Sequence, residues 1–267
     1  MPSSRSASPI SPASESLLRA SHPAAALAWK LALAPLLVAQ AIATRRRAPL
    51  LPEAGGERFG RLGAGGAPLL RILIAGDSSA AGVGVAHQDA AVAGYLVRTL
   101  QQAWTGPVEW ALHARSGLTT LGVHEMLRGA MPAPADVAVV VSGVNDVVDR
   151  VSVRRALGHR AALADWLLEQ GLAGHVVFAP LPPMHRFPLL PEPLRRVMGG
   201  DAIRHDAALA RWAAGRSDVS HVPIALELHP GVMASDGFHP GEPVYRACGE
   251  ALGLHVAKTA RRPGLLA

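Results

Sequence analysis

The side chains best able to do chemistry in this chain lie in three short segments. Gly76-Asp77-Ser78 supplies a hydroxyl, Gly143-Val144-Asn145-Asp146 supplies an amide, and Asp236-Gly237-Phe238-His239-Pro240 supplies an acid and a histidine. A serine hydroxyl is a poor nucleophile until a base removes its proton, and the base needs an acid to fix its tautomer. The three segments together predict a serine hydrolase.

An α/β fold would bring these segments together. From Leu69 onward, short apolar runs alternate with longer stretches of helical pattern, which is typical of βα units and a parallel sheet. The carboxyl ends of parallel strands share one edge of the sheet, where catalytic groups gather. We expect strands at 70–75, 108–114, 137–141 and 175–179. We expect helices at 90–104, 119–128, 153–170, 202–214 and 243–259.

One segment does not fit this alternation. Five prolines between Leu181 and Gly200 argue against long regular structure, yet apolar residues are interspersed among them. Such a loop could cap the core or could form a wall of an acyl-binding pocket, and the sequence leaves both open.

At these residues the chain resembles the GDSL, or SGNH, hydrolase family, over about residues 69 to 260. Gly76-Asp77-Ser78-Ser79 matches the first family block, with Ser79 where leucine is commonest. Gly117 lies where the second block is expected, and it is the least specific match. The segments that hold Asn145 and His239 match the third and fifth blocks. The resemblance implies a three-layer α/β/α domain with a parallel, flavodoxin-like sheet.

The resemblance also implies a role for each residue. Ser78 would attack an ester carbonyl, His239 would accept its proton, and Asp236 would orient His239. The oxyanion hole would consist of the backbone N–H groups of Ser78 and Gly117 and the side-chain amide of Asn145. Asp77 and Asp146 would support the site.

Each residue has a simpler interpretation when taken alone. Asn145 and Asp146 could cap a helix, and Asp236 and His239 could be ordinary loop residues. The coincidence of three segments in order favours the catalytic interpretation. His229-Pro230-Gly231 repeats the tripeptide that begins at His239, but only His239 has an aspartate three residues before it. We therefore expect His229 to be structural or to line a pocket.

We expect an N-terminal extension over residues 1–67 and a hydrolase domain over residues 68–262. The extension would contain a disordered start, a hydrophobic helix at about 24–43 and a linker at 51–67. The apolar stretch holds Lys30, and Arg45-Arg46-Arg47 follows it. A membrane-surface helix or re-entrant anchor, a single span and a helix packed on its own domain all remain open. We therefore expect a cytoplasmic or inner-membrane-associated localisation of bacterial type.

Composition narrows the partners. The first 62 residues hold eight Lys/Arg and three Glu, so they carry five of the six net positive charges. The domain is therefore nearly neutral, and with 4% aromatic residues we expect no nucleic-acid binding. No Cys/His cluster or phosphate-binding glycine motif is present, so we expect no metal and no cofactor. The single cysteine, Cys248, reads as a buried structural thiol.

The predicted activity is hydrolysis of a small-molecule or lipid-like carboxylic ester, as in an esterase or lysophospholipase. A carbohydrate O-deacetylase or a thioesterase would use the same groups. A membrane-associated scaffold without turnover is the alternative from a different class.

Overall fold

The computed structural model describes residues 32–64 and 68–261. The chain divides into two compact units, one ending at Arg46 and the other beginning at Arg47. All but the last residue of helix α3 (Ala34–Arg47) belongs to the first unit. The predicted hydrophobic helix at 24–43 thus lies partly outside the described residues, and its described part continues through the three arginines. Across the described residues, no helix has both the length and the apolar character needed to cross a membrane.

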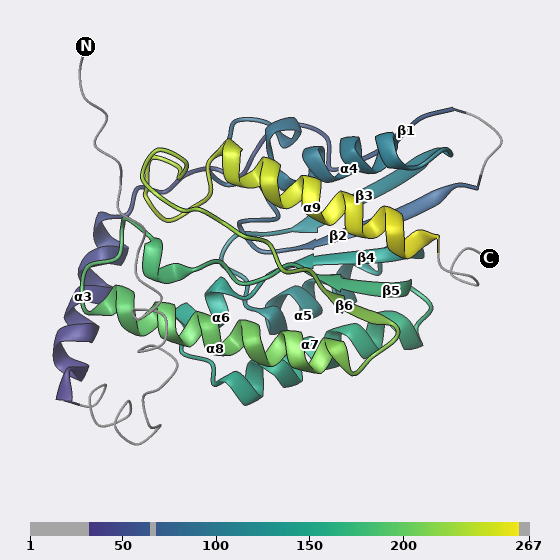
Figure 1. The fold of residues 1–267 in the computed structure, drawn as a ribbon. Coiled ribbons are helices and arrows are strands. Elements are labelled where there is room, and N and C mark those ends of the chain that lie inside the picture. Colours follow the sequence, from purple (N-terminus) through teal and green to yellow (C-terminus); the bar gives the residue numbers. More distant parts are fainter. Residues whose placement is uncertain (1–31, 65–67, 262–267) are drawn as a thin grey trace, which may run out of the picture. The chain divides into compact units, whose positions relative to one another are not determined.

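The second unit is built on one six-stranded sheet (Figure 1). The strand order is β1-β3-β2-β4-β5-β6, and only β1 is antiparallel to its neighbour. The five parallel strands follow the flavodoxin-like order, in which the first of them lies between the second and the third. The strands are β1 (Phe59–Leu62), β2 (Leu70–Gly76), β3 (Val108–Ala114), β4 (Ala135–Val141), β5 (Ala173–Phe178) and β6 (Val219–His221).

Helices cover both faces of this sheet (Figure 1). Helices α4 and α9 pack together on one face, and α5, α7 and α8 lie on the other. The helices of this unit are α4 (Val92–Ala103), α5 (Thr120–Ala130), α6 (Val144–Val148), α7 (Val153–Glu169), α8 (Leu194–Ala214) and α9 (Glu242–Ala260). The predicted mixed α/β architecture is confirmed. Residues 72–75 of β2 and 137–141 of β4 form continuous apolar runs because both faces of these strands are covered there.

The linker predicted at 51–67 is wrong for residues 53–62. Strand β1 lies within it and pairs with β3, from Phe59 opposite Ala111 to Leu62 opposite Val108. Ala54 is buried, and its backbone N–H donates to the carbonyl of Ala81. The second unit therefore begins before the boundary predicted between residues 67 and 68. A glycine-rich segment can belong to a folded domain when backbone hydrogen bonds from other strands fix it.

The proline-rich segment is also more regular than predicted. Helix α8 begins at Leu194, directly after the last proline, Pro193. The prolines exclude a helix only before that position. At the start of a helix a backbone N–H has no intrahelical partner, so a proline there costs no hydrogen bond. Ahead of α8, Met184 and Leu190 are buried. The segment therefore caps the core, as the first of its two interpretations predicts.

Candidate active site

Ser78, His239 and Asp236 form one continuous hydrogen-bonded chain. Ser78 lies two residues beyond the end of β2, and His239 lies in the loop before α9. His239 Nε2 is 3.0 Å from Ser78 Oγ, and His239 Nδ1 is 2.5 Å from Asp236 Oδ2. Because a carboxylate accepts hydrogen bonds, Nδ1 carries the proton and Nε2 is free to accept one from the serine hydroxyl.

The loop that carries the histidine is tightly fixed. Asp236 Oδ1 accepts hydrogen bonds from the backbone N–H groups of Phe238 and His239, both at 2.9 Å. The backbone N–H of Ala234 donates to the carbonyl of His239 at 2.9 Å. Both carboxylate oxygens of Asp236 are therefore used, one for the backbone and one for the imidazole.

The environment keeps Asp236 ionised. Its burial alone would raise its pKa, but the hydrogen bonds from the His239 side chain and from the two backbone N–H groups outweigh burial and lower the pKa. An ionised Asp236 is what the orientation of His239 requires.

Gly117 and Asn145 also lie at the carboxyl edge of the sheet. The N–H of Arg115, just after β3, donates to the carbonyl of Gly76 at 3.3 Å, which places the turn with Gly117 beside the end of β2. Asn145 Nδ2 donates to the carbonyl of Leu118 at 2.9 Å. The structure thus brings the Asn145 side chain to the Gly117 turn.

Asp146 connects the turn that holds Gly117 to the segment that holds Asn145. Its carboxylate accepts hydrogen bonds from the backbone N–H of Thr120 at 3.2 Å and from the Thr120 hydroxyl at 2.5 Å. Arg160 Nη2 donates to Asp146 Oδ2 at 3.2 Å. Burial lowers the pKa of Arg160, although the nearby carboxylates of Asp146 and Asp206 oppose this. The pair fixes the start of α5 to the start of α6.

Arg160 was not among the residues predicted from sequence. Its guanidinium lies against Gly143, where a Cβ would stand 2.5 Å from Arg160 Nη2. Gly143 has φ of +131°, a value that other residues rarely adopt. The sequence spacing could have indicated that Arg160 is buried, because it lies four residues after Ala156 and three before Leu163, on the buried face of α7. A lone arginine in an apolar helical stripe indicates a buried ion pair.

Asp77 has a different environment from the other two aspartates. Its Oδ1 accepts a hydrogen bond from the backbone N–H of Ser79 at 2.9 Å, and its Oδ2 is buried without a hydrogen-bond partner among the described residues. Burial raises the pKa of Asp77 to about 6, against the opposing effects of the Ser79 N–H and of His239. Asp77 shapes the turn at Ser78 and makes no hydrogen bond to His239 among those described.

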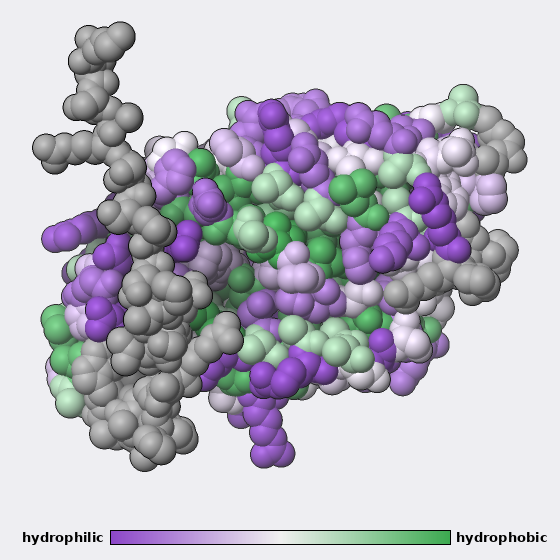
Figure 2. All heavy atoms as spheres, in the orientation of Figure 1, coloured by the Kyte–Doolittle hydropathy of each residue, from purple (hydrophilic) through white to green (hydrophobic). Residues whose placement is uncertain are grey.

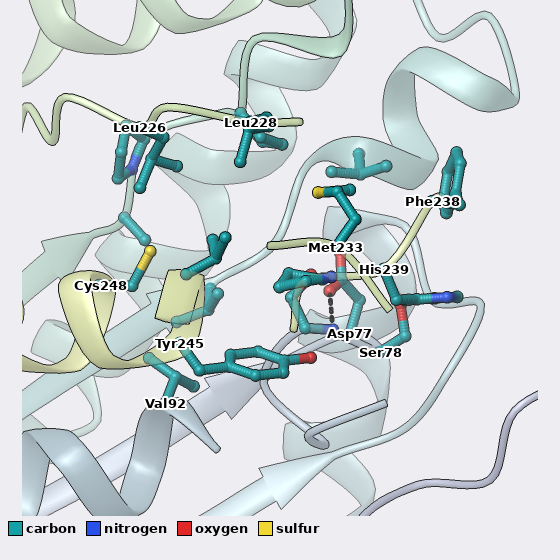
Figure 3. A pocket seen from close by; sticks show the side chains of 18 of the residues that line it. Asp77, Ser78, Val92, Leu226, Leu228, Met233, Phe238, His239, Tyr245 and Cys248 are labelled. Atoms are coloured by element: carbon teal, nitrogen blue, oxygen red, sulfur yellow. Dashed lines mark hydrogen bonds between the residues drawn. The ribbon is translucent and has the colours of Figure 1, made fainter. Parts of the chain in front are cut away.

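An apolar cavity adjoins Ser78 and His239 (Figure 3). Ser78, His239 and Phe238 lie at one end, and Val92 and Cys248 lie at the other. The apolar side chains that line it include Val92, Phe187, Leu226, Leu228, Met233, Phe238, Val244, Tyr245, Cys248 and Leu252. Phe187 comes from the proline-rich segment, as does Pro182, which also lines the cavity, so that segment forms one wall and the chain before α9 forms much of the rest.

Two further predictions can be compared with the structure. His229 is exposed and its Nδ1 accepts a hydrogen bond from the N–H of Gly231 at 3.1 Å, so it stabilises a turn and does not line the cavity. Burial raises the pKa of Cys248 to about 12, consistent with an inert thiol, although this thiol lines the cavity.

Comparisons with known proteins bear on the family and the fold of this chain. The GDSL-like Lipase/Acylhydrolase family matches residues 74–247, and no curated protein matches the sequence. A family 3 carbohydrate esterase from Clostridium thermocellum is 16% identical, with a TM-score of 0.54 over 73% of this chain and 100% of that one. A lipase/acylhydrolase from Enterococcus faecalis is 17% identical, with a TM-score of 0.53 over 71% of this chain and 96% of that one.

An acetyl-xylooligosaccharide esterase variant from Geobacillus is 17% identical, with a TM-score of 0.50 over 73% of this chain and 95% of that one. At these identities the structural likeness shows the fold alone, whereas the family match spans more than half of the sequence. The chain belongs to the GDSL-like lipase/acylhydrolase family, whose members are ester-hydrolysing enzymes.

Proposed function

We propose that this protein hydrolyses carboxylic esters through an acyl-enzyme on Ser78. The observation that carries the proposal is the position of His239, 3.0 Å from the Ser78 hydroxyl and 2.5 Å from Asp236. This is the geometry that general-base activation of a serine requires.

The steps follow from that geometry. Ser78 Oγ attacks the carbonyl carbon while His239 Nε2 accepts the hydroxyl proton, and Asp236 stabilises the resulting imidazolium. The N–H groups of Ser78 and Gly117 and the amide of Asn145 stabilise the oxyanion. The tetrahedral intermediate collapses, His239 protonates the leaving alcohol, and a water molecule activated by His239 then hydrolyses the acyl-enzyme.

The cavity supports an apolar acyl group. Val244, Cys248 and Leu252 line it at intervals of four residues along one face of α9. Eight residues of helix extend about 12 Å, so the cavity wall is long. Its lining is mainly apolar, which favours a hydrocarbon chain over a sugar ring. An acyl chain of several carbons, as in a lysophospholipid or another lipid-derived ester, fits this shape.

Labelling with a fluorophosphonate tests the mechanism. Wild-type protein should label, Ser78→Ala should not, and a wild type that fails to label would contradict the proposal. Chromogenic esters of increasing acyl length should then be compared with acetylated sugars and acyl thioesters. Preference for acetylated sugars would favour a carbohydrate O-deacetylase, in keeping with the names of two structural neighbours. Preference for thioesters would favour a thioesterase, and folded protein without any turnover would favour a scaffold.

We further propose that the N-terminal unit contacts a membrane surface. Leu36, Val38 and Ile42 of α3 are 44–48% exposed, and the helix ends in three arginines. Each basic residue near an anionic bilayer contributes about 1 kcal/mol to binding. Full-length protein should therefore sediment with anionic vesicles, and replacing Arg45, Arg46 and Arg47 by Gln should release it. Equal sedimentation of both proteins would contradict this proposal.

A further inference from the structure

Glu53 binds the turn that carries Gly117. Its Oε1 accepts hydrogen bonds from the backbone N–H of Ser116 at 2.6 Å and from the Ser116 hydroxyl at 2.8 Å. These residues are 63 positions apart, and Glu53 lies before residue 74, where the family match begins. A segment outside the matched region therefore reaches the loop beside the candidate nucleophile.

Arg58 holds the Glu53 carboxylate in place. Arg58 Nη2 donates to Glu53 Oε2 at 2.6 Å, and Arg58 Nη1 donates to the carbonyl of Ala114 at 2.8 Å. The ion pair thus bonds both the last residue of β3 and the turn that follows it. Burial would raise the pKa of Glu53, but the hydrogen bonds from Ser116 and the contact with Arg58 outweigh it and lower the pKa.

The backbone around Glu53 is fixed by its own hydrogen bonds. The N–H of Gly55 donates to the carbonyl of Ala86 at 3.0 Å, and the N–H of Gln88 donates to the carbonyl of Gly55 at 2.8 Å. The side chain of Gln88 also donates to the carbonyl of Ala54 at 3.2 Å. The backbone that carries Glu53 is therefore held in place, and this fixes the position of the Glu53 side chain beside the turn.

Gly117 has little support of its own. It is exposed, its φ is +82°, and among the described residues no atom outside its chain neighbours lies within 4 Å of the place a Cβ would take. Its position depends on its neighbours. Glu53 holds Ser116 on one side, and Asn145 holds Leu118 on the other. The direction of the Gly117 N–H is set by these two anchors.

We propose that Glu53 is a positioning residue that aims the Gly117 N–H at the oxyanion. This inference rests on the proposed function, because it requires an oxyanion to be stabilised. Glu53 touches no reacting atom, and it acts through Ser116. Arg58 neutralises its charge and keeps its carboxylate in register with the turn.

The test compares Glu53→Ala with Glu109→Ala on a short-chain chromogenic ester. Glu109 is a matched control, because it is a similarly exposed carboxylate that pairs with Arg61 at 3.3 Å but does not contact the turn. A misaligned oxyanion donor weakens the stabilisation of the transition state but not the binding of the substrate. Glu53→Ala should therefore lower kcat about 10- to 100-fold without changing KM. Binding of an alkylboronic acid, which mimics the tetrahedral intermediate, should weaken in parallel. Glu109→Ala should leave all three quantities unchanged.

Two more variants address folding and chemistry. Glu53→Asp keeps the charge but shortens the side chain by one methylene, so its kcat should fall as that of Glu53→Ala does. This variant tests the positioning role even if Glu53→Ala does not fold. Glu53→Gln keeps an acceptor for Ser116 but places an amide N–H group against Arg58 Nη2, so its kcat should lie between those of Glu53→Ala and wild type. If Glu53→Ala and Glu53→Asp both turn over like Glu109→Ala, the positioning role is overturned.

Failure of the inference differs from failure of the proposed function. If wild type hydrolyses esters, Ser78→Ala does not, and the Glu53 variants behave like the control, only the role of Glu53 fails. If wild type neither labels with fluorophosphonate nor turns over any ester, the proposed function fails and this inference fails with it.

Discussion

The guanidinium of Arg160 lies 3.2 Å from the carboxylate of Asp146, and the two side chains are only 1% and 0% exposed. Asp146 also accepts two hydrogen bonds from Thr120. The hydrogen bonds between Asp146 and Thr120 therefore join the loop after β3 to the loop after β4, which carry Gly117 and Asn145, and the ion pair with Arg160 neutralises the carboxylate that makes them. The charged pair is stable in the interior because the Asp146 carboxylate has several donors.

Removing the arginine should destabilise the fold strongly. In Arg160→Met, Asp146 would keep only Thr120 as a partner, and an uncompensated buried charge typically costs about 3 to 5 kcal/mol. Urea denaturation should show a loss of this size in the free energy of unfolding. Arg61→Met, which breaks an exposed pair with Glu109, should cost no more than about 1 kcal/mol. Equal losses in the two variants would show that the buried pair contributes no more to the free energy of unfolding than the exposed pair does.

Asn145 should matter for turnover more than for folding. Its side chain is partly buried and donates one hydrogen bond, to the carbonyl of Leu118. If its other N–H faces the oxyanion, Asn145→Ala should lower kcat about 10²- to 10³-fold, as loss of one oxyanion donor does. The measurement is steady-state kinetics beside circular dichroism. Near-normal kcat in folded Asn145→Ala would remove Asn145 from the proposed oxyanion hole.

Much of the fold and of the site was predictable from sequence because the signals were local. Strands β2 and β4 are buried on both faces over most of their length, and residues 72–75 and 137–141 in them are unbroken apolar runs. Asp236 and His239 are three residues apart, and their hydrogen bond forms within one loop. The order of the three polar segments then places Ser78 at the same edge of the sheet.

The missed features depend on contacts between distant residues. Strand β1 has only four residues and a 69% exposed phenylalanine, so no alternating pattern marks it. Glu53 gains its role from Ser116, 63 residues later, and nothing in either local sequence indicates that pairing. The cavity likewise combines α4, α9 and the segment before α9, and its shape follows from packing that periodicity does not encode.

The two His-Pro-Gly histidines should differ sharply when each is replaced. His239→Ala removes the group that bonds both Ser78 and Asp236, and we expect kcat to fall at least about 10³-fold. His229→Ala removes a turn contact on the surface, so kcat should stay near wild type. The comparison needs only kcat for both variants on one ester. Comparable losses would leave the general base unassigned.

Two aspartates of the site should respond to pH in opposite directions. The folded state raises the pKa of Asp77 from 3.8 to about 6, so it binds this proton more tightly than the unfolded state does. Its contribution to the free energy of unfolding therefore falls as pH rises from 3.8 to about 6, by about 3 kcal/mol in total. Asp77→Asn should be more stable than wild type above pH 6, with the gain vanishing below 3.8.

Asp236→Asn provides the opposite case. The folded state lowers the pKa of Asp236, so its ionised form stabilises the protein above the unfolded value of 3.8. This stability is lost as pH falls through the folded pKa, and Asp236→Asn should be less stable than wild type at neutral pH. Urea denaturation of both variants across pH 3 to 8 measures the two trends. Parallel trends in the two variants would contradict the different environments described for these carboxylates.

The far end of the cavity should set the length of the acyl chain. Cys248 lies at that end with Val92, away from Ser78 and His239 (Figure 3), and apolar residues gather on the molecular face between α8 and α9 (Figure 2). Cys248→Phe would fill this end, so each methylene excluded from the cavity should cost about 0.8 kcal/mol, or about fourfold in kcat/KM. Long-chain esters should lose activity stepwise while acetyl esters keep theirs. Cys248→Ala, which leaves the cavity open, should retain the wild-type chain-length profile. An unchanged profile in a folded Cys248→Phe would show that the acyl chain binds elsewhere.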